Sequence, residues 1–391
     1  MHAFVRILLC WLLWLPLVVL AQNLEGTPTP RPQLLQPPAP PELSARGYLL
    51  MDFDSGEVLA ERNADAPLEP ASLTKLMTVH VALGELARGA LNLDDEVTVS
   101  EKAWRTIGSR MFIEVDTRVR VSDLLRGIII QSGNDASVAL AEHIAGSEAA
   151  FAQMMNDEAA RLGMTRTRFR NATGLPDDGH ITTARDMAKA AAAIIREFPE
   201  YYAWYSEREF TYNGIRQKNR NRLLGRTQGV DGLKTGHTEA AGFCLVSSAE
   251  RDGQRLISVV MGTGSDEARM RDSENLLNYG FRFFETHRLF DAGQLLTQLR
   301  VYLGKSKHLD AGPARDLFVT IPRGGYEAMN ATLVPNGTLE APIAVGEIVG
   351  EIEVRLGDSL IKTVPAIALT DIPEAGFFKR GVDTLMQRLG R

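Results

Sequence analysis

Three short polar motifs, each set against an apolar stretch, constrain the fold of this chain most strongly. They are Ser72-Leu-Thr-Lys75, Ser132-Gly-Asn134 and Lys234-Thr-Gly236, in that order along 391 residues. Together they supply a nucleophilic hydroxyl, an amine that can serve as its base, a second hydroxyl with an amide, and a further cation. The fold is therefore expected to bring three distant segments to one polar site, and the chemistry expected there is acyl transfer through a serine ester.

The first motif opens a long apolar run, Leu73 to Leu83, which predicts a buried helix. Ser72 is expected to cap that helix, and the spacing of three residues places Lys75 on the same face. Unpaired backbone N–H groups and the positive end of the helix dipole lie nearby, which suits a nucleophile whose product carries an oxyanion. Alone, the motif fits a capping serine with a solvated lysine better than a catalytic pair; the other two motifs reverse this and favour the catalytic interpretation.

The surroundings of the other two motifs predict where each lies. An apolar stretch over 124–131 ends at Ser132, and helical periodicity resumes at Asp135, so the second motif is expected in a tight turn between two buried helices. Strand-like segments at 230–233 and 242–247 flank the third motif, which places its lysine on a strand. An ordinary helix connector and an exposed edge lysine are the alternatives that these segments leave open.

Composition excludes several classes of protein. A hydrophobic content of 45% and a charged content of 24% are those of an ordinary globular chain, long enough for two or three domains. The net charge of −6 and the lack of a suitable motif argue against a nucleic-acid partner. Two cysteines exclude a disulfide framework, and Cys244 is expected to be a small core residue. The seven histidines show no paired ligand spacing, so no metal and no cofactor are expected.

The first 43 residues read as a leader and a spacer. Arg6 precedes an apolar run that ends in a small-residue cleavage signal, so residues 1–21 predict a signal peptide and export. An uncleaved membrane anchor is the alternative. Residues 22–43 are rich in proline and are expected to form an extended linker.

In the remaining chain the pattern of apolar and polar residues changes at about residue 289 and again at about residue 374. In residues 44–288, strand-like segments at both ends enclose long helical stretches, including 148–162 and 184–196, which predicts an α+β sandwich. Residues 289–373 alternate short apolar runs with glycine and proline and predict a small all-β domain that serves as a spacer or docking module.

The last segment, 374–391, has the pattern of an amphipathic helix. Its apolar residues fall on one helical face, and its net charge is +2. A basic amphipathic helix at a chain end can lie in an anionic membrane surface. The alternative is a helix that packs on its own protein.

From about Leu43 to the C-terminus, the chain resembles the low-molecular-mass penicillin-binding proteins that act as D-alanyl-D-alanine carboxypeptidases. Beyond the three motifs, the resemblance rests on the segments 132–137, 171–176, 183–187, 219–221, 230–237 and 281–284. It implies a serine DD-peptidase/β-lactamase-like antiparallel sheet with flanking helices, followed by the β-domain and tail helix. It further implies removal of the terminal D-alanine from peptidoglycan stem pentapeptides, acylation by β-lactam antibiotics, and a periplasmic protein attached to the inner membrane surface through 374–391.

The resemblance also assigns roles to residues. Ser72 is expected to be the nucleophile, Lys75 its base and Ser132 a proton relay to the leaving D-alanine. The Lys75 ammonium must lose a proton to act, and burial together with the nearby charge of Lys234 is expected to lower its pKa. The expected substrate-binding residues are Asn134, Lys234, Thr235, Gly236, His237 and Arg269. Thr173 departs from the pattern, because relatives often carry histidine there.

Three rival functions remain to be weighed. A class A β-lactamase shares the motifs, but it needs a Glu-x-x-x-Asn loop, and no convincing one lies between the second and third motifs. A D,D-endopeptidase on cross-linked peptidoglycan has the same chemistry with a different leaving group. A non-enzymatic wall-binding scaffold would not need Ser72, Lys75 and Lys234 to be intact.

Overall fold

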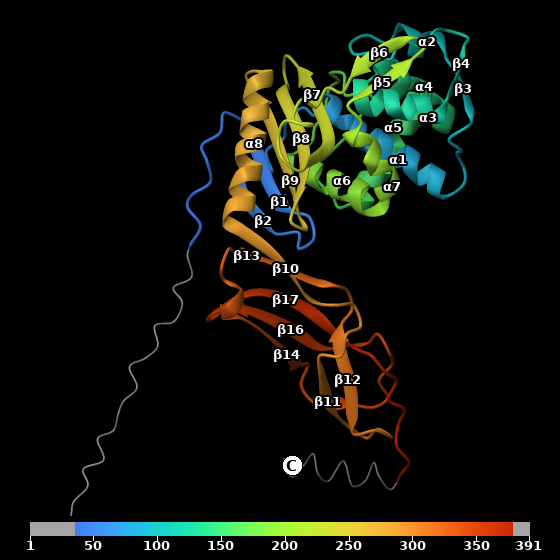
Figure 1. Ribbon diagram of the computed structural model, residues 1–391. Coiled ribbons are helices and arrows are strands. Elements are labelled where there is room, and N and C mark those ends of the chain that lie inside the picture. Colours follow the sequence, from blue (N-terminus) through green and yellow to red (C-terminus); the bar gives the residue numbers. More distant parts are fainter. Residues whose placement is uncertain (1–35, 378–391) are drawn as a thin grey trace, which may run out of the picture. The chain divides into compact units, whose positions relative to one another are not determined.

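A computed structural model describes residues 36–377 of the chain (Figure 1). The expected signal peptide, most of the proline-rich linker and all but the first residues of the expected tail helix lie outside the described residues. Within the described range, no helix is both long enough and apolar enough to cross a membrane. The α+β architecture predicted from the sequence is confirmed.

The first part of the fold is built on a five-stranded antiparallel sheet with the order β2-β1-β9-β8-β7. Its strands are β1 (Gly47–Asp52), β2 (Val58–Arg62), β7 (Val230–Thr238), β8 (Gly242–Arg251) and β9 (Gln254–Thr263). Strands from both ends of this region therefore pair side by side, as the sequence predicted. Consecutive apolar residues serve opposite faces of the sheet: Leu50 packs toward α8 (Asp266–Phe283), and Leu49 packs into the larger helical core.

The helical part lies on the face of the sheet opposite α8 (Figure 1). Its helices are α1 (Thr74–Ala87), α2 (Glu101–Arg105), α3 (Val121–Arg126), α4 (Asn134–Ala145), α5 (Glu148–Arg161), α6 (Ala184–Glu197) and α7 (Pro199–Tyr202). Short helical turns are η1 (Ala71–Leu73), η2 (Gly127–Gln131) and η3 (Ala203–Ser206), and two hairpins are β3 (Glu96–Thr98) with β4 (Arg118–Arg120) and β5 (Glu209–Tyr212) with β6 (Ile215–Lys218).

Local sequence explains where the helices begin. Helices α2, α5, α6 and α8 each start after a serine or threonine whose hydroxyl accepts a backbone N–H of the first turn. Such a cap contributes about 1 kcal/mol. Helix α1 differs, because it is buried from Thr74 to Leu83 and carries no side-chain cap. Its stability comes from packing on every side, as its apolar run predicted.

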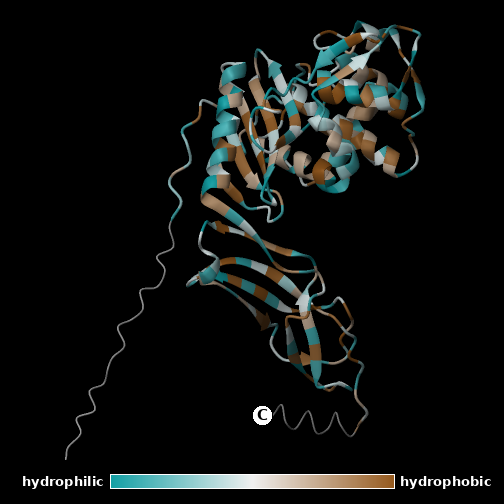
Figure 2. Cartoon of the chain, viewed as in Figure 1, coloured by the Kyte–Doolittle hydropathy of each residue, from teal (hydrophilic) through white to brown (hydrophobic). Residues whose placement is uncertain are grey.

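The C-terminal part is all-β. Strand β10 (Phe284–Phe290) pairs with β13 (Leu317–Pro322), so β10 runs across position 288, the boundary expected from the sequence. A second sheet has the order β14-β16-β17-β12-β11-β15. Its strands are β11 (Thr297–Tyr302), β12 (His308–Pro313), β14 (Met329–Pro335), β15 (Leu339–Glu340), β16 (Ile348–Leu356) and β17 (Ser359–Ala368), with the turn η4 (Tyr326–Ala328) before β14. Figure 2 shows apolar and polar residues alternating along these strands, which leaves one face for the core.

Candidate active site

Ser72 and Lys75 meet at the start of helix α1. Ser72 lies in the turn η1 and is half-buried, and its Oγ is 3.1 Å from Lys75 Nζ. The expected capping role of Ser72 is wrong, because Leu73 is the N-cap residue of α1 and no side chain caps the helix. Since Ser72 Oγ does not cap the helix, it is available to the amine, which is the arrangement an activated nucleophile needs.

The Lys75 amine is enclosed by oxygen acceptors. Nζ donates to Ser72 Oγ, to Asn134 Oδ1 at 2.7 Å and to the backbone carbonyl of Thr173 at 2.5 Å. Burial lowers the pKa of Lys75 to about 7; Asp135 raises it and the Arg220 guanidinium lowers it further. The lowered pKa was predicted, with burial as its main cause; the structure adds Arg220 as a further cation that acts on Lys75. A lysine with this pKa can lose its proton near neutral pH and then accept the hydroxyl hydrogen of Ser72.

Ser132 occupies the tight turn predicted between two helices. The turn follows η2, and Ser132 itself takes left-handed backbone angles, with φ of 67°. A residue with a Cβ pays about 1–2 kcal/mol for that conformation, so the surrounding helices must hold it there. Lys234 Nζ donates to Ser132 Oγ at 2.9 Å, which joins the second motif to the third.

Asn134 and Asp135 hold the loop in front of the site. Asn134 Nδ2 donates to the carbonyl of Ile107 at 2.7 Å, while its Oδ1 accepts from Lys75. The Asp135 carboxylate accepts the backbone N–H groups of Met111 and Phe112, both at 2.8 Å. Asp135 was not among the predicted site residues, although its place directly after the second motif is a signal in the sequence; in the structure it is fully buried.

The third motif lies on the edge strand β7, next to the turn that carries Ser72. Lys234, Thr235 and Gly236 are buried, whereas His237 is exposed and stacks on Phe243 at 3.9 Å. A Cβ on Gly236 would lie 3.1–3.2 Å from the Pro70 carbonyl and neighbouring atoms of η1, so glycine permits this close approach. Burial lowers the pKa of Lys234 well below its usual range, and the charge of Lys75 lowers it further.

Arg269 reaches the same strand from helix α8. Its Nη1 donates to the carbonyls of Gly236 at 3.0 Å and Cys244 at 3.3 Å, and its guanidinium pairs with Asp266. The side chain is buried. The structure thus brings all nine sequence-predicted site residues to one place.

The loop after α5 completes the site with backbone atoms. Thr173 supplies only its carbonyl to Lys75; its hydroxyl donates to Asn171 Oδ1 at 2.9 Å. The contact therefore does not depend on which side chain stands at position 173. Gly174 has φ of +82°, and a Cβ there would lie 1.8 Å from the Ala71 carbonyl, so the loop fits against η1 only with glycine.

The acceptors around Lys75 are also informative about the rival β-lactamase. Among the residues the structure describes, Lys75 Nζ contacts a hydroxyl, an amide oxygen and a backbone carbonyl. None of these three acceptors of the amine is a carboxylate. The geometry favours an enzyme in which the lysine itself is the base.

Comparisons with known proteins agree with this site. The chain matches the D-alanyl-D-alanine carboxypeptidase family over residues 35–265 and the C-terminal domain of penicillin-binding protein 5 over residues 284–374. It is 44% identical to the D-alanyl-D-alanine carboxypeptidase DacC of Escherichia coli over 356 residues, which covers 89% of each chain. It is 43% identical to DacA of the same organism, covering 88% of each chain.

Solved structures give the same result. Penicillin-binding protein 5 from Haemophilus influenzae superposes with a TM-score of 0.84 at 42% identity, covering 86% of this chain and 100% of that chain. An ampicillin-bound penicillin-binding protein D2 from Listeria monocytogenes superposes with a TM-score of 0.57 at 35% identity, covering 62% of this chain and 100% of that chain. The chain therefore belongs to the D-alanyl-D-alanine carboxypeptidase family of penicillin-binding serine peptidases.

Proposed function

We propose that this enzyme removes the terminal D-alanine from peptidoglycan stem pentapeptides through an acyl-enzyme on Ser72. The observation that carries the proposal is the 3.1 Å contact between Ser72 Oγ and the fully buried Lys75 Nζ, whose pKa is lowered to about 7. General-base help from a positioned amine is typically worth about 10²–10⁴ in rate.

In the proposed acylation, neutral Lys75 accepts the proton of Ser72 Oγ, which attacks the carbonyl carbon of the penultimate D-alanine. Backbone N–H groups of Ser72 and His237 stabilise the resulting oxyanion; losing one such donor typically costs about 10²–10³ in rate. Ser132, which accepts a hydrogen bond from Lys234 Nζ at 2.9 Å, relays a proton to the leaving D-alanine nitrogen. The peptide C–N bond breaks and a Ser72 ester remains. Water then cleaves the ester and restores the free hydroxyl.

Substrate binding is proposed to use the third motif and Arg269 on one side, and Asn134 of the second motif on the other. Lys234, Thr235 and Arg269 bind the terminal carboxylate of the substrate, and their position on or against β7 supports this assignment. Gly236 leaves room for the substrate backbone along the strand. Asn134 holds the substrate amide; it is already fixed by Lys75 and the Ile107 carbonyl. β-Lactams enter the same site as covalent inhibitors.

The test compares leaving groups. We expect the protein to release D-alanine from diacetyl-Lys-D-Ala-D-Ala and to leave cross-linked muropeptide dimers intact. Conversion of dimers to monomers at a comparable rate would instead assign the D,D-endopeptidase activity. Rapid hydrolysis of penicillin without D-alanine release would assign a β-lactamase, and no turnover of either kind would leave a wall-binding scaffold.

We further propose the chain's organisation and location from its sequence. Residues 1–21 are a signal peptide, 22–43 a linker, 44–288 the catalytic region, 289–373 the β-domain and 374–391 an amphipathic anchor. The protein would then be exported to the periplasm and attached to the inner membrane surface by its last segment. Deleting 374–391 should release it from membranes without lowering turnover of a soluble peptide; continued membrane retention would show that another segment is the anchor.

A further inference from the structure

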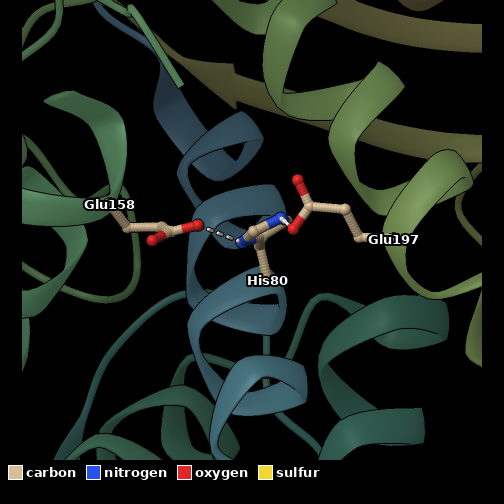
Figure 3. A group of neighbouring side chains, drawn as sticks. All are labelled: His80, Glu158 and Glu197. Carbon is tan, nitrogen blue, oxygen red and sulfur yellow. Dashed lines mark ion pairs between the residues drawn. The ribbon is translucent and has the colours of Figure 1, made fainter. Parts of the chain in front are cut away.

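A second cluster of titratable side chains is centred on the buried His80 of helix α1. Figure 3 shows the His80 ring between the carboxylates of Glu158 on α5 and Glu197 on α6. His80 is 98% buried, since its relative exposure is 2%. These three residues, called the His80 cluster below, are far apart in sequence, so histidine spacing alone did not reveal them.

The contacts of the imidazole leave its bonding incomplete. Nδ1 is 3.2 Å from a Glu158 oxygen and Nε2 is 3.4 Å from a Glu197 oxygen, but neither contact has the alignment of a hydrogen bond. When the ring is neutral, one ring nitrogen in either tautomer directs a lone pair toward an anionic oxygen. A cation that the ring nitrogen itself coordinates would remove that repulsion.

The distances fit a metal ion. One ligand atom from each of the three residues lies within 4.8 Å of the others. Imidazole and carboxylate ligands of Zn²⁺ lie about 2.0–2.2 Å from the ion, so two ligands of a tetrahedral ion are about 3.3–3.6 Å apart. Each pair of ligand atoms must therefore approach by at most about 1.5 Å, which rotation of the partly exposed Glu158 and Glu197 side chains can supply.

The surroundings supply access and further ligands. The cluster forms part of the wall of a cavity of about 450 Å³, with Val81, Met154 and Phe198 as apolar neighbours. Water from this cavity can occupy the remaining coordination positions, as at sites with three protein ligands. We propose that the His80 cluster binds one divalent transition-metal ion of the Zn²⁺ class through one ring nitrogen and one oxygen of each glutamate. The ion would join helices α1, α5 and α6 behind the segment that carries Ser72 and Lys75.

Arg161 is the competing cation. Its Nη2 lies 2.7 Å from each of the two carboxylate oxygens that face the His80 ring, one of Glu158 and one of Glu197. The side chain is 52% exposed, so the guanidinium can turn toward solvent or pair with the outer carboxylate oxygens when an ion binds. Removing this arginine should therefore strengthen metal binding, whereas removing any ligand of the cluster should weaken it.

The test is a titration of purified, chelator-treated protein with Zn²⁺ in a calorimeter and with Co²⁺ by visible absorption. We expect one ion per chain. The affinity should fall by about tenfold or more in His80→Gln and Glu197→Gln, and it should rise in Arg161→Gln. His143→Ala is the matched control, because His143 is an exposed histidine on α4, and its affinity should equal that of the wild type. Zn²⁺ should also raise the Tm of the wild type but not that of His80→Gln.

Penicillin labelling of Ser72 and circular dichroism verify that each variant is folded. The proposal is overturned if neither the wild type nor Arg161→Gln binds Zn²⁺ or Co²⁺. It is equally overturned if His80→Gln, in folded form, binds the ion as tightly as the wild type.

Discussion

The catalytic region and the C-terminal β region bury their side chains differently. Every polar or charged residue that is almost fully buried between residues 36 and 377 lies at or before Ser273. The two cores of the β region consist of apolar residues such as Leu309 and Ile352. Burying a polar group costs free energy unless it finds partners, so a fold accepts this cost where chemistry needs it. The difference indicates that the chemistry is concentrated in the catalytic region.

The largest effect expected is the loss of the nucleophile. Ser72→Ala should abolish covalent labelling by penicillin and turnover of peptide, because no ester can form, while thermal unfolding stays near that of the wild type. The control in the β region is Ser359→Ala, an exposed serine at the start of β17, which should label normally. Labelling that persists in Ser72→Ala would show that Ser72 is not the nucleophile and that the reaction is not confined to this site.

The second effect separates a fully buried amine, that of Lys75, from a half-buried one, that of Lys362. Lys75→Met should lower the rate of acylation by about 10²–10⁴, because the general base is lost. Lys362→Met is the matched variant, since Lys362 Nζ donates to the carbonyls of Ser55 at 3.0 Å and Phe318 at 2.9 Å and lies in β17. It should acylate at the wild-type rate. Stopped-flow kinetics with a chromogenic β-lactam measure the acylation rates of both variants. Equal rates in Lys75→Met and the wild type would contradict the assignment of Lys75 as the general base.

The third effect is pH dependence. Lys75 acts only when neutral, and its pKa is lowered from 10.5 to about 7. The acylation rate should therefore rise about tenfold per pH unit below pH 7 and level off above it. A rate that is flat or that falls between pH 5 and 7 would contradict this assignment.

The smallest effect on chemistry is expected in the β region. Ile352 is fully buried, so Ile352→Ala should destabilise the protein by about 2–5 kcal/mol, because it leaves a cavity. The acylation rate of the folded variant should not change. Denaturant unfolding and labelling kinetics, measured on one sample, check both statements; a large fall in the acylation rate would show that the β region supports catalysis directly.

The sequence predicted the parts of this fold that periodicity and turn residues encode. The buried helix after Ser72, the turn at Ser132, the strands at both ends of the catalytic region and the all-β C-terminal part are all confirmed. The three motifs predicted most of the site residues, because each motif keeps its residues within one turn or one strand. The resemblance to a known family then added His237 and Arg269, which local patterns do not single out.

What could not be predicted depends on contacts between distant segments. The Thr173 carbonyl reaches Lys75 through the backbone, so no side chain signals it. Ser72 does not cap its helix, because Leu73 takes that position and the serine hydroxyl faces the amine instead. The His80 cluster draws on three helices, and no spacing in the sequence relates its members.

The most direct test of the account is a time course of intact and peptide mass after brief exposure of the protein to penicillin, followed alongside D-alanine release from diacetyl-Lys-D-Ala-D-Ala. The account predicts one adduct per chain, located on the peptide that contains Ser72, decaying slowly in a protein that releases D-alanine when penicillin is absent. An adduct on another residue, or rapid drug hydrolysis with no adduct and no D-alanine release, would contradict it.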